Sequence, residues 1–136
     1  MRLSRHLALW SIVAGAFATS AQAHNRREPK LEFIGRYQPP DAAFDEGVSE
    51  IVAYDEDNEE LYVVNARDAT IEILSIADPT NPVPVDEIDV GAFGGVANSV
   101  AVKDGVVVIA VEAFVKQDPG QLIFFEVDGN LYDGDG

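Results

Sequence analysis

The sequence contains no cysteine and few basic residues. Its 136 residues include two His, one Met, one Trp and nine Lys or Arg against 24 Asp or Glu, for a formal net charge of −15. The absence of cysteine excludes disulfide bonds, thiolate metal sites and thiol nucleophiles. The shortage of basic residues argues against nucleic acid as a partner, because phosphate binding needs clustered Lys and Arg.

Hydrophobic residues are nevertheless abundant, at 47% of the chain. This content is too high for a disordered acidic tail, and the length accommodates at most one small domain. The excess of acidic residues favours a solvated surface suited to salty surroundings over a cation-binding role.

Residues 1–23 have the three parts of an export signal. Two arginines precede an apolar run of 12 residues, Leu7–Ala18, and Ala21-Gln22-Ala23 is a small-x-small cleavage site. An apolar run of this length is too short to span a bilayer as a helix. We therefore expect a helical signal peptide cleaved near Ala23. The mature chain, residues 24–136, is then extracytoplasmic (secreted, periplasmic or at the cell surface) and has no transmembrane span.

The rest of the chain is a series of short apolar runs separated by turn residues. An apolar run at Leu31–Tyr37 precedes Pro39-Pro40 and is typical of an edge strand. Asp104-Gly105 predicts a two-residue hairpin turn. Seven further runs have the length and composition of strands: 50–54, 61–65, 70–76, 85–90, 98–103, 106–111 and 121–127.

These predicted strands form an internal repeat. Residues 49–55 (SEIVAYD) align with residues 98–104 (NSVAVKD) at a spacing of 49, and each copy continues as strand, turn, strand, loop, strand. A period near 50 with about four antiparallel strands per unit is typical of β-propeller blades. A β-sandwich is the alternative, although a sandwich needs no internal repeat. We predict an all-β fold of antiparallel four-stranded blades in an incomplete ring, with blade one at about 44–90 and blade two at about 96–136.

Several segments in their order resemble the opening of choice-of-anchor I proteins. They are FIGRYQ, LYVVNA, TIEILSIADPTNPVPV, NSVAVKDGVVVIAVEA and DPGQLIFFEVDG, and the resemblance extends over 31–130. It implies a secreted or surface-attached propeller, related to the mesenchyme-specific cell-surface glycoprotein group and to YVTN-type propellers. Such proteins continue through further blades, and a ring needs four to eight. We therefore expect an N-terminal fragment, or a piece that requires a partner.

The ends of the innermost strands supply the candidate site. In a propeller these positions point toward the central funnel, where oxygen-bearing side chains suit a hard cation such as Ca²⁺. The same side chains also commonly bond backbone groups at strand ends, which is the competing interpretation. The candidate metal ligands are Glu46, Glu50, Asn65, Asn98 and Glu112.

Two functions from different classes follow. The first is a non-catalytic binding or surface-interaction module for a protein, glycan or surface polymer, with no catalytic residue. The alternative is a calcium-dependent phosphatase or phytase-like esterase in the funnel, which requires carboxylates converging on bound cations. After cleavage His24 is the sole histidine, which argues against Ser-His-Asp catalysis. We favour the binding module.

Overall fold

The computed structural model describes residues 29–40 and 49–134. The predicted signal peptide and Glu46 therefore lie outside the described residues. The described residues from Glu32 onward belong to one compact unit, whose fold is presented below. Within the described ranges no helix is long and apolar enough to cross a membrane.

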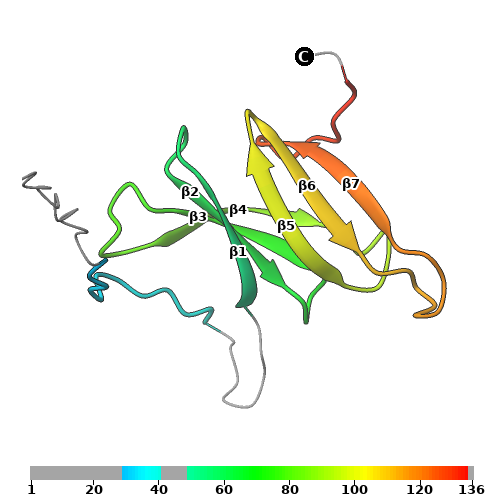
Figure 1. The fold of residues 1–136 in the computed structure, drawn as a ribbon, viewed down its shortest axis with the longest axis horizontal. Helices are drawn as coiled ribbons and strands as arrows, with labels where there is room; N and C mark the ends of the chain where they lie inside the picture. Colours follow the sequence, from blue (N-terminus) through cyan, green and yellow to red (C-terminus); the bar gives the residue numbers. More distant parts are fainter. Residues whose placement is uncertain (1–28, 41–48, 135–136) are drawn as a thin grey trace, which may run out of the picture. The chain divides into compact units, whose positions relative to one another are not determined.

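Seven strands form two antiparallel sheets in which neighbours in sequence are neighbours in space (Figure 1). The first sheet contains β1 (Ser49–Asp55), β2 (Glu60–Asn65), β3 (Thr70–Ser75) and β4 (Val83–Asp89). The second sheet contains β5 (Ala97–Lys103), β6 (Val106–Val111) and β7 (Gln121–Glu126). A bridge between Phe125 and Leu131 lies beside β7, where a fourth strand would pair. The predicted all-β class is confirmed, and the two sheets are consistent with blades of an incomplete propeller.

Strands β1 and β5 begin 48 residues apart, whereas the sequence alignment spaced them by 49. Strands β1 and β5 begin at Ser49 and Ala97 and end at Asp55 and Lys103. The sequence alignment paired Asp55 with Asp104, but Asp55 ends a strand whereas Asp104 begins a turn. Because side chains alternate along a strand, this shift of one residue exchanged the two faces of the sheet.

The turns explain this difference between the copies. Four residues connect β1 to β2, whereas only Asp104 and Gly105 connect β5 to β6. Both residues of the shorter turn have positive φ, 51° and 81°, as the predicted two-residue hairpin requires. The longer turn has positive φ only at its last residue, Glu59.

The core lies between the two sheets. We call the face of the first sheet that meets the second sheet its front face, which carries Ala53, Tyr62, Val64, Ile71 and Ile73. The opposing back face of the second sheet carries Val100, Val102, Val107, Ile109 and Phe125. Full burial of such a side chain contributes roughly 1.5–3 kcal/mol. This interface is therefore a main source of stability.

Tyr62 connects the two sheets through a polar contact as well. Its hydroxyl lies within donating distance of two acceptors, Glu60 Oε2 at 3.3 Å and the Val127 carbonyl oxygen at 3.5 Å. Burial, together with the carboxylates of Glu60, Asp55 and Asp86, raises the pKa of Tyr62 well above its ordinary value. The hydroxyl therefore remains a hydrogen-bond donor.

The order of the faces distinguishes propeller-like stacking from a sandwich. We match β1 to β5 at a spacing of 48 residues and follow the strand register of the second sheet. Its front face then carries Ala101, Val108, Ala110, Leu122 and Phe124. The equivalent back face of the first sheet carries Val52, Tyr54, Leu61, Val63 and Leu74. The sheets thus pack front to back, as successive blades do, whereas two equivalent faces would meet in a symmetric sandwich.

The strand predicted at Leu31–Tyr37 is not present, and these residues have no regular secondary structure. Gly35 instead approaches the β3–β4 loop so closely that a Cβ there would lie 2.1 Å from the Pro79 carbonyl oxygen. The Tyr37 hydroxyl donates to Glu72 Oε1 at 3.5 Å. The apolar run joins neither sheet, and its side chains stay largely exposed, at 81% for Phe33 and 60% for Ile34.

Candidate functional site

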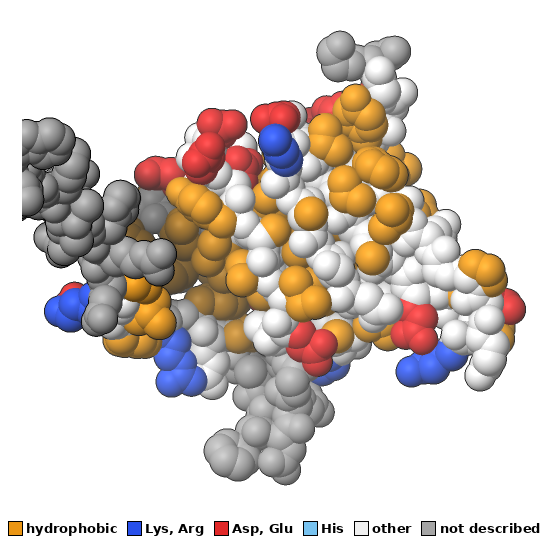
Figure 2. All heavy atoms as spheres, in the orientation of Figure 1, with side chains coloured by type: hydrophobic (Ala, Val, Ile, Leu, Met, Phe, Trp, Pro, Cys, Tyr) orange, Lys and Arg blue, Asp and Glu red, His pale blue; other side chains and the backbone are white. Residues whose placement is uncertain are grey.

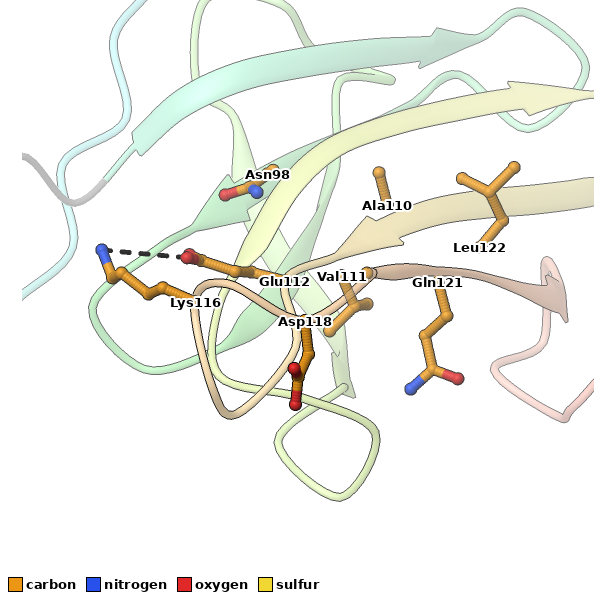
Figure 3. A pocket seen from close by; sticks show the side chains of 9 residues that line it. Asn98, Ala110, Val111, Glu112, Lys116, Asp118, Gln121 and Leu122 are labelled. Atoms are coloured by element: carbon orange, nitrogen blue, oxygen red, sulfur yellow. Dashed lines mark ion pairs between the residues drawn. The ribbon is translucent and has the colours of Figure 1, made fainter.

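The structure brings two of the five predicted site residues into one pocket. Asn98, at the start of β5, and Glu112, just after β6, both line it (Figure 3). Glu50 is exposed on β1 and Asn65 is buried at the end of β2, and neither lines this pocket. Glu46 lies outside the described residues.

Asn65 has a role within its own turn. Its amide nitrogen donates to Asp68 Oδ2 at 3.0 Å, and its Oδ1 accepts from the Asp68 backbone N–H at 3.2 Å. Hydrogen bonds from Arg67, and then from Asn65, lower the pKa of Asp68 below its ordinary value. The Asn65 amide thus hydrogen-bonds within its own turn, as polar side chains at strand ends commonly do.

The pocket has a volume of about 520 Å³, within the range typical of small-ligand sites. It is formed by the ends of β5, β6 and β7 together with the loop 112–120. The lining residues are Asn98, Ala110, Val111, Glu112, Lys116, Asp118, Gly120, Gln121 and Leu122.

A close backbone approach positions Glu112. Its N–H donates to the Val96 carbonyl at 2.8 Å, and its carbonyl accepts from the Gly95 N–H at 2.9 Å. A Cβ on Gly94 would lie 2.1 Å from the Glu112 carbonyl oxygen and 2.5 Å from Val111 Cγ1. Only glycine fits at Gly94 without displacing the segment that carries Glu112.

The pocket carries charges of both signs. Lys116 Nζ lies 3.8 Å from Glu112 Oε1, and the Glu112 side chain is 23% exposed (Figure 3). Because Lys116 is largely exposed, this ion pair adds little to stability and leaves the ammonium group accessible to a ligand. Asp118 adds a second carboxylate, and the Gln121 amide donates to the Phe93 carbonyl.

Sequence reasoning missed Lys116, Asp118 and Gln121. The available signal was a difference between the repeats, since four residues join β2 to β3 whereas nine, 112–120, join β6 to β7. A loop extended on a repeated scaffold is a common place for a binding site. The prediction considered only residues at the ends of the innermost strands, so it left out Lys116 and Asp118 in the loop and Gln121 at the start of β7.

The pocket combines hydrogen-bond donors with oxygen acceptors above an apolar floor. Lys116 and Asn98 donate, Glu112 and Asp118 accept, and Ala110, Val111 and Leu122 supply the apolar area. This mixture suits a polar ligand that both donates and accepts. Among residues 29–40 and 49–134, no group of three His, Cys, Asp or Glu is placed to hold a metal ion.

Repeated meander sheets stacked front to back define a propeller-type β protein. A family model of the choice-of-anchor I domain matches residues 50–133, which is more than half of the chain. The protein therefore belongs to the choice-of-anchor I family, whose name points to a cell-surface or extracellular location. No curated protein matches the chain.

Proposed function

We propose that this protein is a non-catalytic binding module that contacts a glycan or hydroxyl-rich surface polymer through the pocket between Asn98 and Gln121. The observation that carries this proposal is the mixed lining of the pocket, where an ammonium, two carboxylates and two amides surround an apolar floor. Hydroxyl groups of sugars both donate and accept hydrogen bonds, so each of these side chains has a possible contact.

The proposed setting is outside the cytoplasm. The export signal at 1–23, with cleavage near Ala23, supports secretion or surface attachment. The mature region 24–136 then forms blade one at about 44–90 and blade two at about 96–136. Within the family, the ordered segments support a relationship to the mesenchyme-specific cell-surface glycoprotein group.

The direct test is binding of the purified protein to immobilised glycans, followed by calorimetric titration of those that bind. We expect Lys116→Ala and Glu112→Gln each to weaken binding by about tenfold, which corresponds to about 1.4 kcal/mol. Lys103→Ala is the matched control, because it removes the same charge from an exposed lysine that does not line this pocket. Equal affinity of all four proteins would contradict the proposed site.

Calcium belongs in the same titration, because Asn98, Glu112 and Asp118 bring oxygen donors to one pocket. Saturable Ca²⁺ binding that Glu112→Gln abolishes, together with hydrolysis of a phosphate ester, would replace the binding module with the metal-dependent hydrolase. Glycan binding that is unaffected by a calcium chelator would support the non-catalytic module.

A further inference from the structure

Two carboxylates line the pocket, but only one of them has a basic partner. Lys116 Nζ lies 3.8 Å from Glu112 Oε1. Within residues 29–40 and 49–134, the Asp118 carboxylate forms no ion pair and accepts no hydrogen bond. In Figure 3 this carboxylate lies apart from the Lys116–Glu112 pair. The pocket therefore offers a ligand one negative charge that no described residue neutralises.

The rest of the protein carries the same sign of charge as Asp118. The sequence has 24 Asp or Glu against nine Lys or Arg, for a formal net charge of −15. Figure 2 shows acidic side chains at both ends of the sheets. A field of this sign repels a polyanion and raises the local concentration of a cation. A polymer of acidic sugars therefore matches the pocket poorly, whereas a ligand with a cationic group matches it well.

The apolar floor of the pocket suits the flat face of a sugar ring. Leu122 is 61% exposed, and Ala110, its partner on β6, is half-buried. A pyranose ring has C–H groups on its faces and polar groups at its rim, so a ring placed on this floor buries apolar area. The polar groups at its rim then face the side chains around the floor, which include Asn98, Asp118 and Gln121.

We infer that the glycan bound by this pocket carries a free amino group, and that the Asp118 carboxylate binds the resulting ammonium ion. The inference rests on the proposed function and names the substrate class of the same pocket. An ammonium–carboxylate contact adds Coulomb attraction to the hydrogen bond, which a neutral hydroxyl does not. An N-acetylated sugar has an uncharged amide at the same place and loses that attraction. Asp118 is then the residue that determines specificity.

The test compares short oligomers of glucosamine, N-acetylglucosamine and glucose that share one linkage. They differ only in one ring substituent, which is an ammonium, an acetamide or a hydroxyl group. Calorimetric titration in mildly acidic buffer keeps the amine protonated. We expect the glucosamine oligomer to bind about tenfold more tightly than the other two, which corresponds to about 1.4 kcal/mol. Added salt should reduce this preference, because it screens exposed charges.

The Asp118→Asn variant tests which residue recognises the charge. It should lower the affinity for the glucosamine oligomer by about tenfold and bring the ratio of the glucosamine and glucose affinities close to one. Glu87→Gln is the matched control, because it removes the same charge from an exposed side chain on β4 that does not line this pocket. This control should retain the preference. A preference that survives Asp118→Asn would overturn the inference.

A lysine oligomer of the same charge separates recognition of the sugar from general attraction to an acidic protein. It should bind much more weakly than the glucosamine oligomer, because it has no ring to pack on Ala110 and Leu122. Equal binding of these two cations would show that overall charge causes the preference, and the inference would be wrong.

The outcomes also separate this inference from the proposed function. Equal binding of the three sugar oligomers, or a preference for an acetylated or acidic glycan, would overturn the inference and leave the glycan-binding module standing. If no glycan binds at all, both the inference and the proposed function fail.

Discussion

The two sheets share a strand order but differ in how β2–β3 and β6–β7 are connected. In the first sheet a turn of four residues is closed by the buried Asn65. In the second sheet nine residues follow β6 and form the wall of the pocket with Lys116 and Asp118. The comparison teaches that the two meander sheets provide a common scaffold, and that the longer connection in the second sheet forms the candidate site.

The front faces differ in a second way. Equivalent positions are fully buried in the first sheet, at Ile71, and largely exposed in the second, at Leu122. Side-chain identity does not explain this contrast, because both residues are large and aliphatic. Position in the stack explains it, since among residues 29–40 and 49–134 a second sheet covers the first front face and none covers the second.

The largest expected effect concerns these equivalent residues. Ile71→Ala should lower the free energy of unfolding by about 2–5 kcal/mol, because it leaves a cavity between the sheets. Leu122→Ala should cost less than about 1 kcal/mol, because Leu122 is already exposed to water. Urea unfolding at low protein concentration measures both values. Equal losses would mean that the two front faces are equally covered.

The next effect concerns the glycines that support the pocket. Gly94→Ala should destabilise the protein by about 1–3 kcal/mol and displace Glu112, since the added Cβ would meet backbone and Val111. Thermal unfolding measures the loss, and the NMR signals of the pocket residues report the displacement.

Gly95→Ala is the control for Gly94→Ala, because its nearest neighbour would be the Ala113 carbonyl oxygen at an ordinary 3.7 Å. We expect it to change stability by less than about 1 kcal/mol. A Gly94→Ala variant as stable as Gly95→Ala would exclude the close backbone approach.

A third prediction compares two asparagines. Asn65→Ala should cost about 1–3 kcal/mol in unfolding free energy, because it removes two hydrogen bonds of a buried side chain. Asn98→Ala should leave stability unchanged within about 0.5 kcal/mol, because Asn98 is exposed, and should weaken glycan binding. Urea unfolding and calorimetric titration separate the two outcomes. If Asn65→Ala weakened binding without loss of stability, Asn65 would belong to the site.

The smallest expected effect is the acid response of the β2–β3 turn. The pKa of Asp68 is lower in the folded protein than its ordinary value, so the folded state binds fewer protons at this group. Its contribution to stability is present above the ordinary pKa and is lost as the pH falls through the lowered one. Asp68→Asn should flatten this part of the stability profile, as measured by urea unfolding between neutral and acidic pH. An unchanged acid limb would show that Arg67 does not stabilise the carboxylate.

Much of the fold could be predicted from the sequence, because alternation and turn chemistry are local. The seven strands and the Asp104-Gly105 turn depend on side-chain period and backbone preference, which neighbouring residues specify. The strand predicted at Leu31–Tyr37 does not form, because a strand needs a partner strand alongside it, and the path of the chain that brings two strands together is not a local property. The alignment of residues 49–55 with 98–104 was off by one residue for a related reason. A change in turn length shifts the register of the strands without changing their apolar pattern.

The candidate site was predicted only in part. Asn98 and Glu112 were selected because they lie at strand ends, and both line one pocket, whereas their role as metal ligands stays a prediction. Selection of residues at strand ends also included Glu50, which is exposed on β1 outside the pocket, and Asn65, which hydrogen-bonds within the β2–β3 turn. Lys116 was missed because a loop tip has no periodic pattern.

The sequence by itself determined the all-β class and the acidic composition, and it predicts an internal repeat and an export signal at 1–23. These features follow from composition and from short-range periodicity. Only the tertiary structure decided that the sheets stack front to back, which front face remains open, and which polar side chains share a pocket. These outcomes depend on register and on the path of loops between distant residues, and a difference of one residue in a turn is enough to change them.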